Sequence, residues 1–248
     1  MLLHQSTWAE VETYLRESNG ILMPIGSTEQ HGPIGMIGTD SICAEAIAKG
    51  VGESLGVMVG PTIGVGMSEH HMRFPGSMTL KPSTLVMVVR DYVMSLAAHG
   101  FRRFLFVNGH GGNLASLQAA FSEIYGELRE PSAADTPDVR CKALNWWQFD
   151  PLPAMGREMF GAADGSHASA SEVAVAQFVD AANIREGKLD PEVAPSGSFF
   201  GADTFRDRYP DGRIGSNSAL ATPEKGEQLY AKSVETIGVA YRAFLAEA

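Results

Sequence analysis

Short apolar runs alternate along this chain with longer segments of helical hydrophobic period, and this alternation constrains the fold most strongly. The runs that predict β-strands are residues 21–25, 56–63, 101–109 and 138–147. The segments that predict helices are residues 8–18, 40–55, 83–99, 114–130, 170–182 and 223–246. Strands that alternate with helices at this spacing form a mostly parallel sheet with helices on both faces. The expected fold is therefore α/β, with three α/β/α layers.

The length and composition fit a single globular domain. A chain of 248 residues can form one large α/β domain or two small ones, and its 44% hydrophobic and 19% charged residues are typical of a folded protein. The region 185–221 is rich in Gly, Pro and Ser, and we interpret it as a long surface loop or subunit contact, not as a linker. Residues 1–248 are therefore expected to form one domain.

An excess of acidic residues limits the partners of the chain. It has 29 Asp and Glu against 19 Lys and Arg, a formal net charge of −10, and no dense basic stretch. Nucleic acids and anionic membranes would repel such a surface, so neither is an expected partner. No apolar stretch approaches the roughly 18 to 20 residues of a membrane span, and the first residues do not resemble a signal peptide.

The two cysteines, Cys43 and Cys141, form neither a disulfide framework nor a CxxC spacing. This usage is the default in a reducing compartment. We therefore expect a soluble, cytoplasmic protein.

Titratable side chains follow the predicted strands. They are Glu29 and His31 after the first strand, His70 and His71 after the second, His110 after the third, and Asp164, His167 and Glu172 beyond the fourth. Active sites of parallel α/β proteins gather where the C-terminal ends of the strands meet. The topology therefore predicts that these residues surround one pocket.

Each of these residues also has an ordinary structural explanation. Asp40 and Glu172 fit the start of a helix, where the helix dipole favours a carboxylate. His110 fits a glycine-rich turn, and residues 29–31 fit a solvated loop. Together these explanations require a separate coincidence at each strand end, so we favour a common site.

Imidazole and carboxylate side chains in this arrangement indicate a metal site. Glu29 and His31 are two residues apart and can face the same way on an extended loop. Mixed nitrogen and oxygen ligands suit Zn²⁺, Mn²⁺ or Fe²⁺, and the lack of a nearby cysteine pair argues against structural zinc. We expect two divalent ions per chain, bridged by one carboxylate and sharing an activated water.

Several other catalytic patterns are missing from the sequence. It has no GxxxxGK[ST] loop, no GxGxxG between a strand and a helix, and no GxSxG nucleophile elbow. A metallophosphatase is disfavoured because the chain offers no clear phosphate-binding cluster.

Five motifs resemble those of the creatininase (creatinine amidohydrolase) family, in the same order and at similar spacing. They are PIGSTEQHGP…GTD, SEHHMRFPGSMTL, NGHGGN, SHASASE and ALATPEKGE. The resemblance extends from about residue 5 to residue 240. It implies a binuclear metal-dependent amidohydrolase of α/β/α architecture, typically assembled as a hexamer, a trimer of dimers.

The resemblance also implies roles for individual residues. The residues that match the family's metal ligands are Glu29, His31, Asp40 and His110, with Asp40 as the bridge. His167 matches a histidine that acts as acid or base near the substrate, and Glu172 matches the glutamate five residues beyond it. We expect both to be catalytic residues.

The expected substrate pocket adds four further residues. They are His71, Ser77, Gly111 and Trp147. For Trp147 and its neighbour Trp146, packing in the core or at a subunit interface is an equal alternative.

Three departures from the family pattern affect the expected site. Gly112 replaces a glutamate metal ligand, so we expect Glu172 to complete the second metal site. Ser166 replaces the glutamate before the pocket histidine, and Ala-Ser-Ala follows His167 in place of Ala-Gly-Glu. Because these changes lie in or beside the pocket, creatinine is not the expected substrate.

Family members that share GHGGN act on formamides of pterin or flavin precursors or trim a peptide during redox-cofactor maturation. The expected function here is hydrolysis of a non-peptide C–N bond, in a cyclic amide, a formamide or a related small molecule. A metal-bridged hydroxide would attack the amide carbon, and His167 would pass a proton to the leaving nitrogen. The alternative is a catalytically silent member that binds metal and serves in binding or assembly, which the changes at Gly112 and Ser166 motivate.

Overall fold

Four parallel strands form the centre of the structure, a computed structural model that describes residues 1–129 and 138–247. The strands are β1 (Gly20–Ile25), β2 (Met58–Val59), β3 (Arg103–Asn108) and β4 (Arg140–Asn145). Their order in the sheet is β2–β1–β3–β4. Ile25 pairs with Asn108, which pairs with Asn145, so β1, β3 and β4 end together at one edge.

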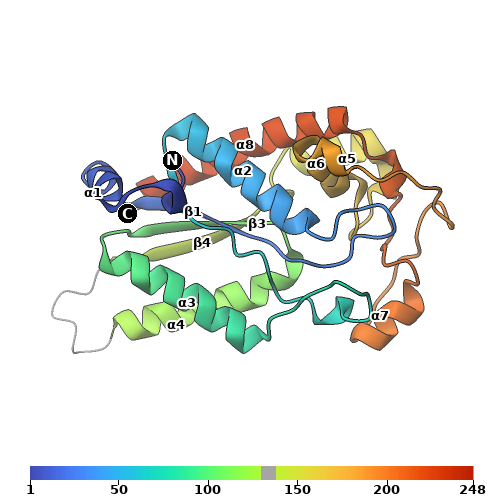
Figure 1. Cartoon of the computed structure of the whole chain (residues 1–248), viewed down its shortest axis with the longest axis horizontal. Helices are drawn as coiled ribbons and strands as arrows, with labels where there is room; N and C mark the ends of the chain where they lie inside the picture. The colour runs from blue at the N-terminus through green and yellow to red at the C-terminus, as the bar shows by residue number, and fades with distance from the viewer. Residues whose placement is uncertain (130–137, 248) are drawn as a thin grey trace.

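Helices cover both faces of this sheet, which confirms the expected α/β/α architecture. The helices are α1 (Trp8–Leu15), α2 (Thr39–Leu55), α3 (Pro82–Ala98), α4 (Leu114–Leu128), α5 (Leu152–Phe160), α6 (Ala170–Val179), α7 (Ala202–Arg208) and α8 (Pro223–Ala246). In Figure 1, α2, α6 and α8 lie on one side of the strands, and α3 and α4 lie on the other. The helices of each layer also pack against one another.

Alternate side chains of the strands point to the two helical layers. Leu22 and Leu105 pack in a core with residues of α2, α6 and α8, whereas Met23 and Phe106 pack with residues of α3 and α4. Successive residues of a strand point to opposite faces of the sheet. All six residues of β1 are buried, which is the pattern of a strand covered on both sides.

The region 185–221 lies mostly on the surface, as a surface loop should, but a few of its side chains are anchored in the interior. It contains α7, and it fully buries Phe205, Tyr209 and Arg213. Phe205 and Tyr209 pack with Phe74 in a third apolar cluster. The Arg213 guanidinium donates to carbonyl oxygens of the same region. A few aromatic side chains and one buried arginine therefore hold a segment whose composition suggests exposure.

The remaining differences are local. The sequence does not predict α5. The strand predicted over 56–63 is limited to Met58–Val59, because Gly60 and Pro61 follow and proline has no N–H to pair in a sheet. The helix predicted over 114–130 ends at Leu128, and position 130 lies outside the described residues. Within the described ranges, no helix is long and apolar enough to cross a membrane.

Candidate metal centre

Four of the predicted ligands form one buried cluster at the C-terminal edge of the sheet. Glu29 and His31 lie in the loop after β1, His110 follows β3, and Asp40 lies in the first turn of α2. Glu29 is fully buried, and even His110, the most accessible of the four, is only 6% exposed. Nδ1 of His110 lies 3.2 Å from Oε1 of Glu29 and 3.1 Å from Oδ2 of Asp40.

Asp40 connects two groups of potential ligands. Its Oδ2 faces His110, and its Oδ1 lies 3.1 Å from Nε2 of His31. The ligand atoms of Glu29, Asp40 and His110 lie within 4.8 Å of one another, as do those of His31, Asp40 and Glu172. Asp40 thus has the geometry of a carboxylate that bridges two ions.

Two buried carboxylate oxygens in this cluster form no hydrogen bond within the described part of the chain. They are Oε1 of Glu29 and Oδ2 of Asp40, which lie beside the His110 ring. Leaving such an acceptor unsatisfied costs about 1–3 kcal/mol or more, and a bound cation would remove that cost. The nitrogen and oxygen donors suit divalent Zn, Mn or Fe. The residues present therefore fit the metal ions that the sequence predicts.

Backbone carbonyl groups orient the two histidine rings of the cluster. Nδ1 of His31 donates to the carbonyl oxygen of Glu29 at 3.0 Å, and Nε2 of His110 donates to that of Met67 at 2.9 Å. Each ring then directs its other nitrogen toward Asp40. A carbonyl partner of this kind fixes the tautomer and leaves the facing nitrogen as a metal ligand.

Charges within the cluster shift the pKa values of its members. Burial lowers the pKa of His31, but the neighbouring carboxylates, led by Asp40, outweigh burial and raise the value to about 10. Burial also lowers the pKa of His110, but the carboxylates of Glu29 and Asp40 outweigh it and raise the value well above its usual range. Burial raises the pKa of Glu29, yet His110 and His71 outweigh it and hold the pKa well below its usual range. The metal-free cluster therefore pairs carboxylates with imidazolium rings.

Glu172 also starts helix α6. Its Oε1 accepts the backbone N–H of Ser169 at 2.5 Å, and its own N–H donates to Oγ of Ser169 at 3.2 Å, which forms a capping box. Burial raises the pKa of Glu172, His31 opposes this and Asp40 adds to it, with a resulting value of about 7. The ordinary helix-start explanation therefore holds for Glu172 together with its position beside the cluster.

Gly112 lies at the position where the family resemblance predicts a glutamate metal ligand. No side chain fits at this position. A Cβ on Gly112 would lie 2.6 Å from the carbonyl oxygen of Met67 and would overlap Nε2 of His110. Met67 and His110 therefore leave no room for a side chain at this position of the turn. Glu172, reaching in from α6, is the carboxylate that lies beside His31 in the second group.

Gln30 links His71 and His167 beside the cluster. Its amide nitrogen donates to Nδ1 of His71 at 3.0 Å and to the carbonyl of Gly212 at 2.9 Å. Nε2 of His167 donates to the backbone carbonyl of Gln30 at 2.9 Å, so its Nδ1 faces Oε1 of Glu29, 3.7 Å away. Burial, followed by repulsion from neighbouring histidines, lowers the pKa of His167 well below its usual value. This neutral imidazole can accept a proton from the side of the cluster.

The sequence analysis assigns no role to Gln30, Ser68 or Asn108, whose hydrogen bonds position the residues of the cluster. Ser68 donates to Oε2 of Glu29. The side-chain amide of Asn108 donates to the carbonyl of His110 and to Asn145, each at 2.7 Å. All three lie inside or next to the motifs that carry the ligands. Position in a motif was thus the only available signal, because these side chains do not titrate.

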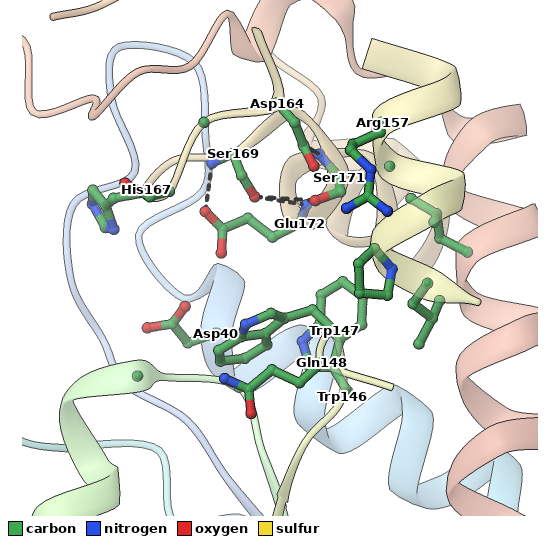
Figure 2. Close-up of a pocket in the computed structure, with 18 of the residues that line it drawn as sticks. Asp40, Trp146, Trp147, Gln148, Arg157, Asp164, His167, Ser169, Ser171 and Glu172 are labelled. Atoms are coloured by element: carbon green, nitrogen blue, oxygen red, sulfur yellow. Dashed lines mark hydrogen bonds between the residues drawn. The ribbon is translucent and has the colours of Figure 1, made fainter. Parts of the chain in front are cut away.

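A cavity of about 590 Å³ opens beside the cluster (Figure 2). Its lining includes Asp40, His110, Gly111, Trp147, His167 and Glu172. In Figure 2 the carboxylates of Asp40 and Glu172 and the ring of His167 face a common space.

The other two predicted pocket residues, His71 and Ser77, are not among the residues that line this cavity. His71 lies 3.2 Å from Glu29, and Ser77 accepts the N–H of Gln30 at 3.1 Å.

The sequence and fold match known proteins along nearly the whole chain. The sequence model of the creatininase family, described as creatinine amidohydrolase, matches residues 4–240. Creatinine amidohydrolase of Pseudomonas putida is 29% identical over 249 residues, which cover 95% of this chain and 94% of that protein. A solved structure named Creatininase Mn has a TM-score of 0.84 at 27% identity, with 99% of each chain covered.

A shorter match connects the chain to a protein named for a peptide substrate. The mycofactocin precursor peptide peptidase of Mycolicibacterium smegmatis is 38% identical over 116 residues, which cover 44% of this chain and 47% of that protein. The match over residues 4–240, together with the fold and the buried cluster of potential metal ligands, shows that this chain belongs to the creatininase family of hydrolases.

Proposed function

We propose that this protein is a binuclear metal-dependent amidohydrolase that cleaves a non-peptide C–N bond, in a cyclic amide, a formamide or a related small molecule. The carboxylate of Asp40 carries this proposal, because one of its oxygens faces His110 and the other faces His31. We assign one metal ion to Glu29, Asp40 and His110. The second ion is assigned to His31, Asp40 and Glu172.

Two divalent ions at these positions would supply an activated water and polarise the carbonyl oxygen of an amide. His167 is proposed to handle the proton. Gln30 holds its Nε2 side, so only Nδ1 faces the cavity and the cluster. Because the ring is neutral, it can take a proton from the attacking water and give it to the leaving nitrogen.

The cavity supports a small amide as the substrate. Its volume of about 590 Å³ falls within the range of small-molecule pockets. Trp146 and Trp147 line it, with ring centroids 5.8 Å apart and planes at 84°. In Figure 2 they lie across the cavity from Glu172 and Ser169. An apolar wall opposite the polar cluster suits a flat molecule that presents one amide to the metal ions.

Metal content and turnover together test this proposal. We expect about two ions per chain by elemental mass spectrometry, and hydrolysis by the loaded protein of members of a panel of formamides and cyclic amides. Asp40→Asn should lose both ions and all turnover, whereas Asp91→Asn, at an exposed carboxylate on α3, should keep both. Less than about one ion per chain and no turnover across the panel would instead support the silent metal-binding protein. Cleavage of peptides alone would contradict the proposed substrate class.

We also propose that residues 1–248 form one domain. A single domain over residues 1–248 is supported by α8, which packs at the end of the chain over the same sheet that β1 enters near its start. The hexamer and the cytoplasmic location stay predictions from the sequence. Light scattering on the purified protein measures the first.

A further inference from the structure

Arg157 places a cation without an ion-pair partner on the wall of the cavity. It lies in α5, and in Figure 2 its guanidinium points into the cavity. Among the described residues, no carboxylate forms an ion pair with it. The nearby acids have other partners, because Asp164 accepts the N–H of Ser171 at 2.8 Å and Glu172 accepts that of Ser169. The guanidinium is therefore available to a ligand.

We propose that Arg157 binds a carboxylate group of the substrate. The amide cleaved at the metal centre would then carry a carboxylate on the side away from the scissile bond. This inference rests on the proposed amidohydrolase function and adds the charge of its substrate. A guanidinium presents a planar fork of N–H donors that matches the two oxygens of a carboxylate.

The arrangement of the cavity gives the substrate a direction. In Figure 2 Arg157 approaches from α5, while Asp40 and His167 lie at the opposite side. Trp147 and Gln148 lie along the wall between them. A flat substrate can therefore place its carboxylate at Arg157 and its amide at the metal ligands.

The charges of the lining favour a monoanion over a phosphate dianion. Of the described residues that line the cavity, Arg157 is the single lysine or arginine. Asp164 and Glu172 share this lining, and their carboxylates would repel a second negative charge. With a net charge of −10 on the whole chain, an anionic substrate depends on such a local cation.

Binding of matched probes to the metal-loaded protein tests the anion site without turnover. Because Arg157 is exposed, benzoate should bind roughly two- to fivefold more tightly than benzamide, the range expected for a solvent-screened ion pair. Arg157→Gln should abolish this difference, and Arg157→Lys should keep part of it. Arg242→Gln, at an exposed arginine on α8 outside the cavity lining, should leave it unchanged. Benzoate that binds Arg157→Gln as well as wild type, or no better than benzamide, would overturn the proposal.

Turnover separates this inference from the proposed function. We expect 4-formamidobenzoate, whose carboxylate lies across the ring from the formamide, to be hydrolysed with a kcat/KM at least roughly twofold above that of formanilide, mainly through KM, and this preference should vanish in Arg157→Gln. Equal kcat/KM for the two formamides in wild type would overturn the role of Arg157. A protein that binds benzoate through Arg157 but hydrolyses neither formamide would support the anion site and count against the proposed hydrolase.

Discussion

Oε1 of Glu172 lies 3.9 Å from Nε2 of His31, although one residue starts α6 and the other lies in the loop after β1. The same glutamate completes the capping box with Ser169. The start of α6 therefore sets where this carboxylate lies relative to the cluster. One side chain serves the helix and the proposed second metal site together.

Glu172→Gln should separate these two roles. Glutamine can also complete a capping box, so the unfolding temperature should change little. A neutral amide is a poor ligand for a divalent cation, so bound metal should fall toward about one ion per chain. Hydrolysis should fall by at least roughly tenfold to hundredfold, the cost of losing even the outer partner of a metal ligand. Elemental mass spectrometry and steady-state kinetics measure both effects.

Ser169→Ala provides the matched control. It removes the hydroxyl that accepts the N–H of Glu172, and the loss of such a cap should destabilise the protein by about 1 kcal/mol. The carboxylate itself remains, so both ions should stay bound. Equal metal loss in Ser169→Ala and Glu172→Gln would contradict the ligand role of Glu172.

Gly112→Ala should disturb the first metal site. The added Cβ would overlap Nε2 of His110 and lie 2.6 Å from the carbonyl of Met67, so the ring must move off the bond that orients it. We expect weaker metal binding and a loss of about 1–3 kcal/mol in the free energy of unfolding. Gly111→Ala is the stability control, because nothing lies within 4 Å of its added Cβ. Equal unfolding free energies in the two variants would show that the turn can accommodate a Cβ at Gly112.

Removing the metal ions should destabilise the fold. Without them, Oε1 of Glu29 and Oδ2 of Asp40 are buried without a hydrogen bond and are balanced only by the neighbouring imidazolium rings. Metal at 100 times its dissociation constant should add about 2.7 kcal/mol per site. Calorimetric scans with and without a chelator measure this shift, and Asp40→Asn should lose most of the response. A wild type that unfolds at the same temperature in both scans would be inconsistent with the proposed sites.

His167→Asn tests whether this histidine moves a proton or binds metal. Its Nδ1 lies 3.7 Å from Glu29, and its ligand atom also groups with those of Glu29 and His31. As a general acid and base it should contribute roughly 10²–10⁴ to turnover. The variant should therefore lose most of kcat and keep both ions. Loss of one ion would reassign His167 as a ligand.

The layers and the edge that carries the cluster could be predicted because they follow from local patterns. The apolar run that becomes β1 fits only a strand covered on both faces, and parallel pairing then brings Glu29 and His110 to the same edge. Asp40 was predictable as a ligand only through the family resemblance. From the residues alone it fits a helix start equally well.

Other features of the site depend on packing that the sequence does not encode locally. Gln30 contacts Gly212 across 182 positions, and no local pattern indicates that pairing. Helix α5 is short and contains Pro153 and Gly156, both poor helix formers, so the intrinsic propensity of its residues does not favour a helix. The position of Arg157 in the cavity could therefore not be predicted from the sequence.

Metal affinity should rise with pH, and its slope should change near pH 7. Metal binding requires deprotonated ligands. In the metal-free protein Glu172 has a pKa of about 7 and His31 one of about 10, so Glu172 must lose a proton only below about pH 7, whereas His31 must lose one up to about pH 10. A plot of log affinity against pH should therefore lose about one unit of slope near pH 7.

The pKa shifts of Glu172 and His31 also determine how the stability of the metal-free protein changes with pH. Both folded-state pKa values lie above their ordinary values, so the stability these groups contribute is full at low pH and is lost as pH rises through about 7 for Glu172 and about 10 for His31. Chelator competition at pH 6, 7 and 8, corrected for protonation of the chelator, measures the affinity. Glu172→Gln should remove the change of slope, and an unchanged slope in that variant would assign the proton to another group.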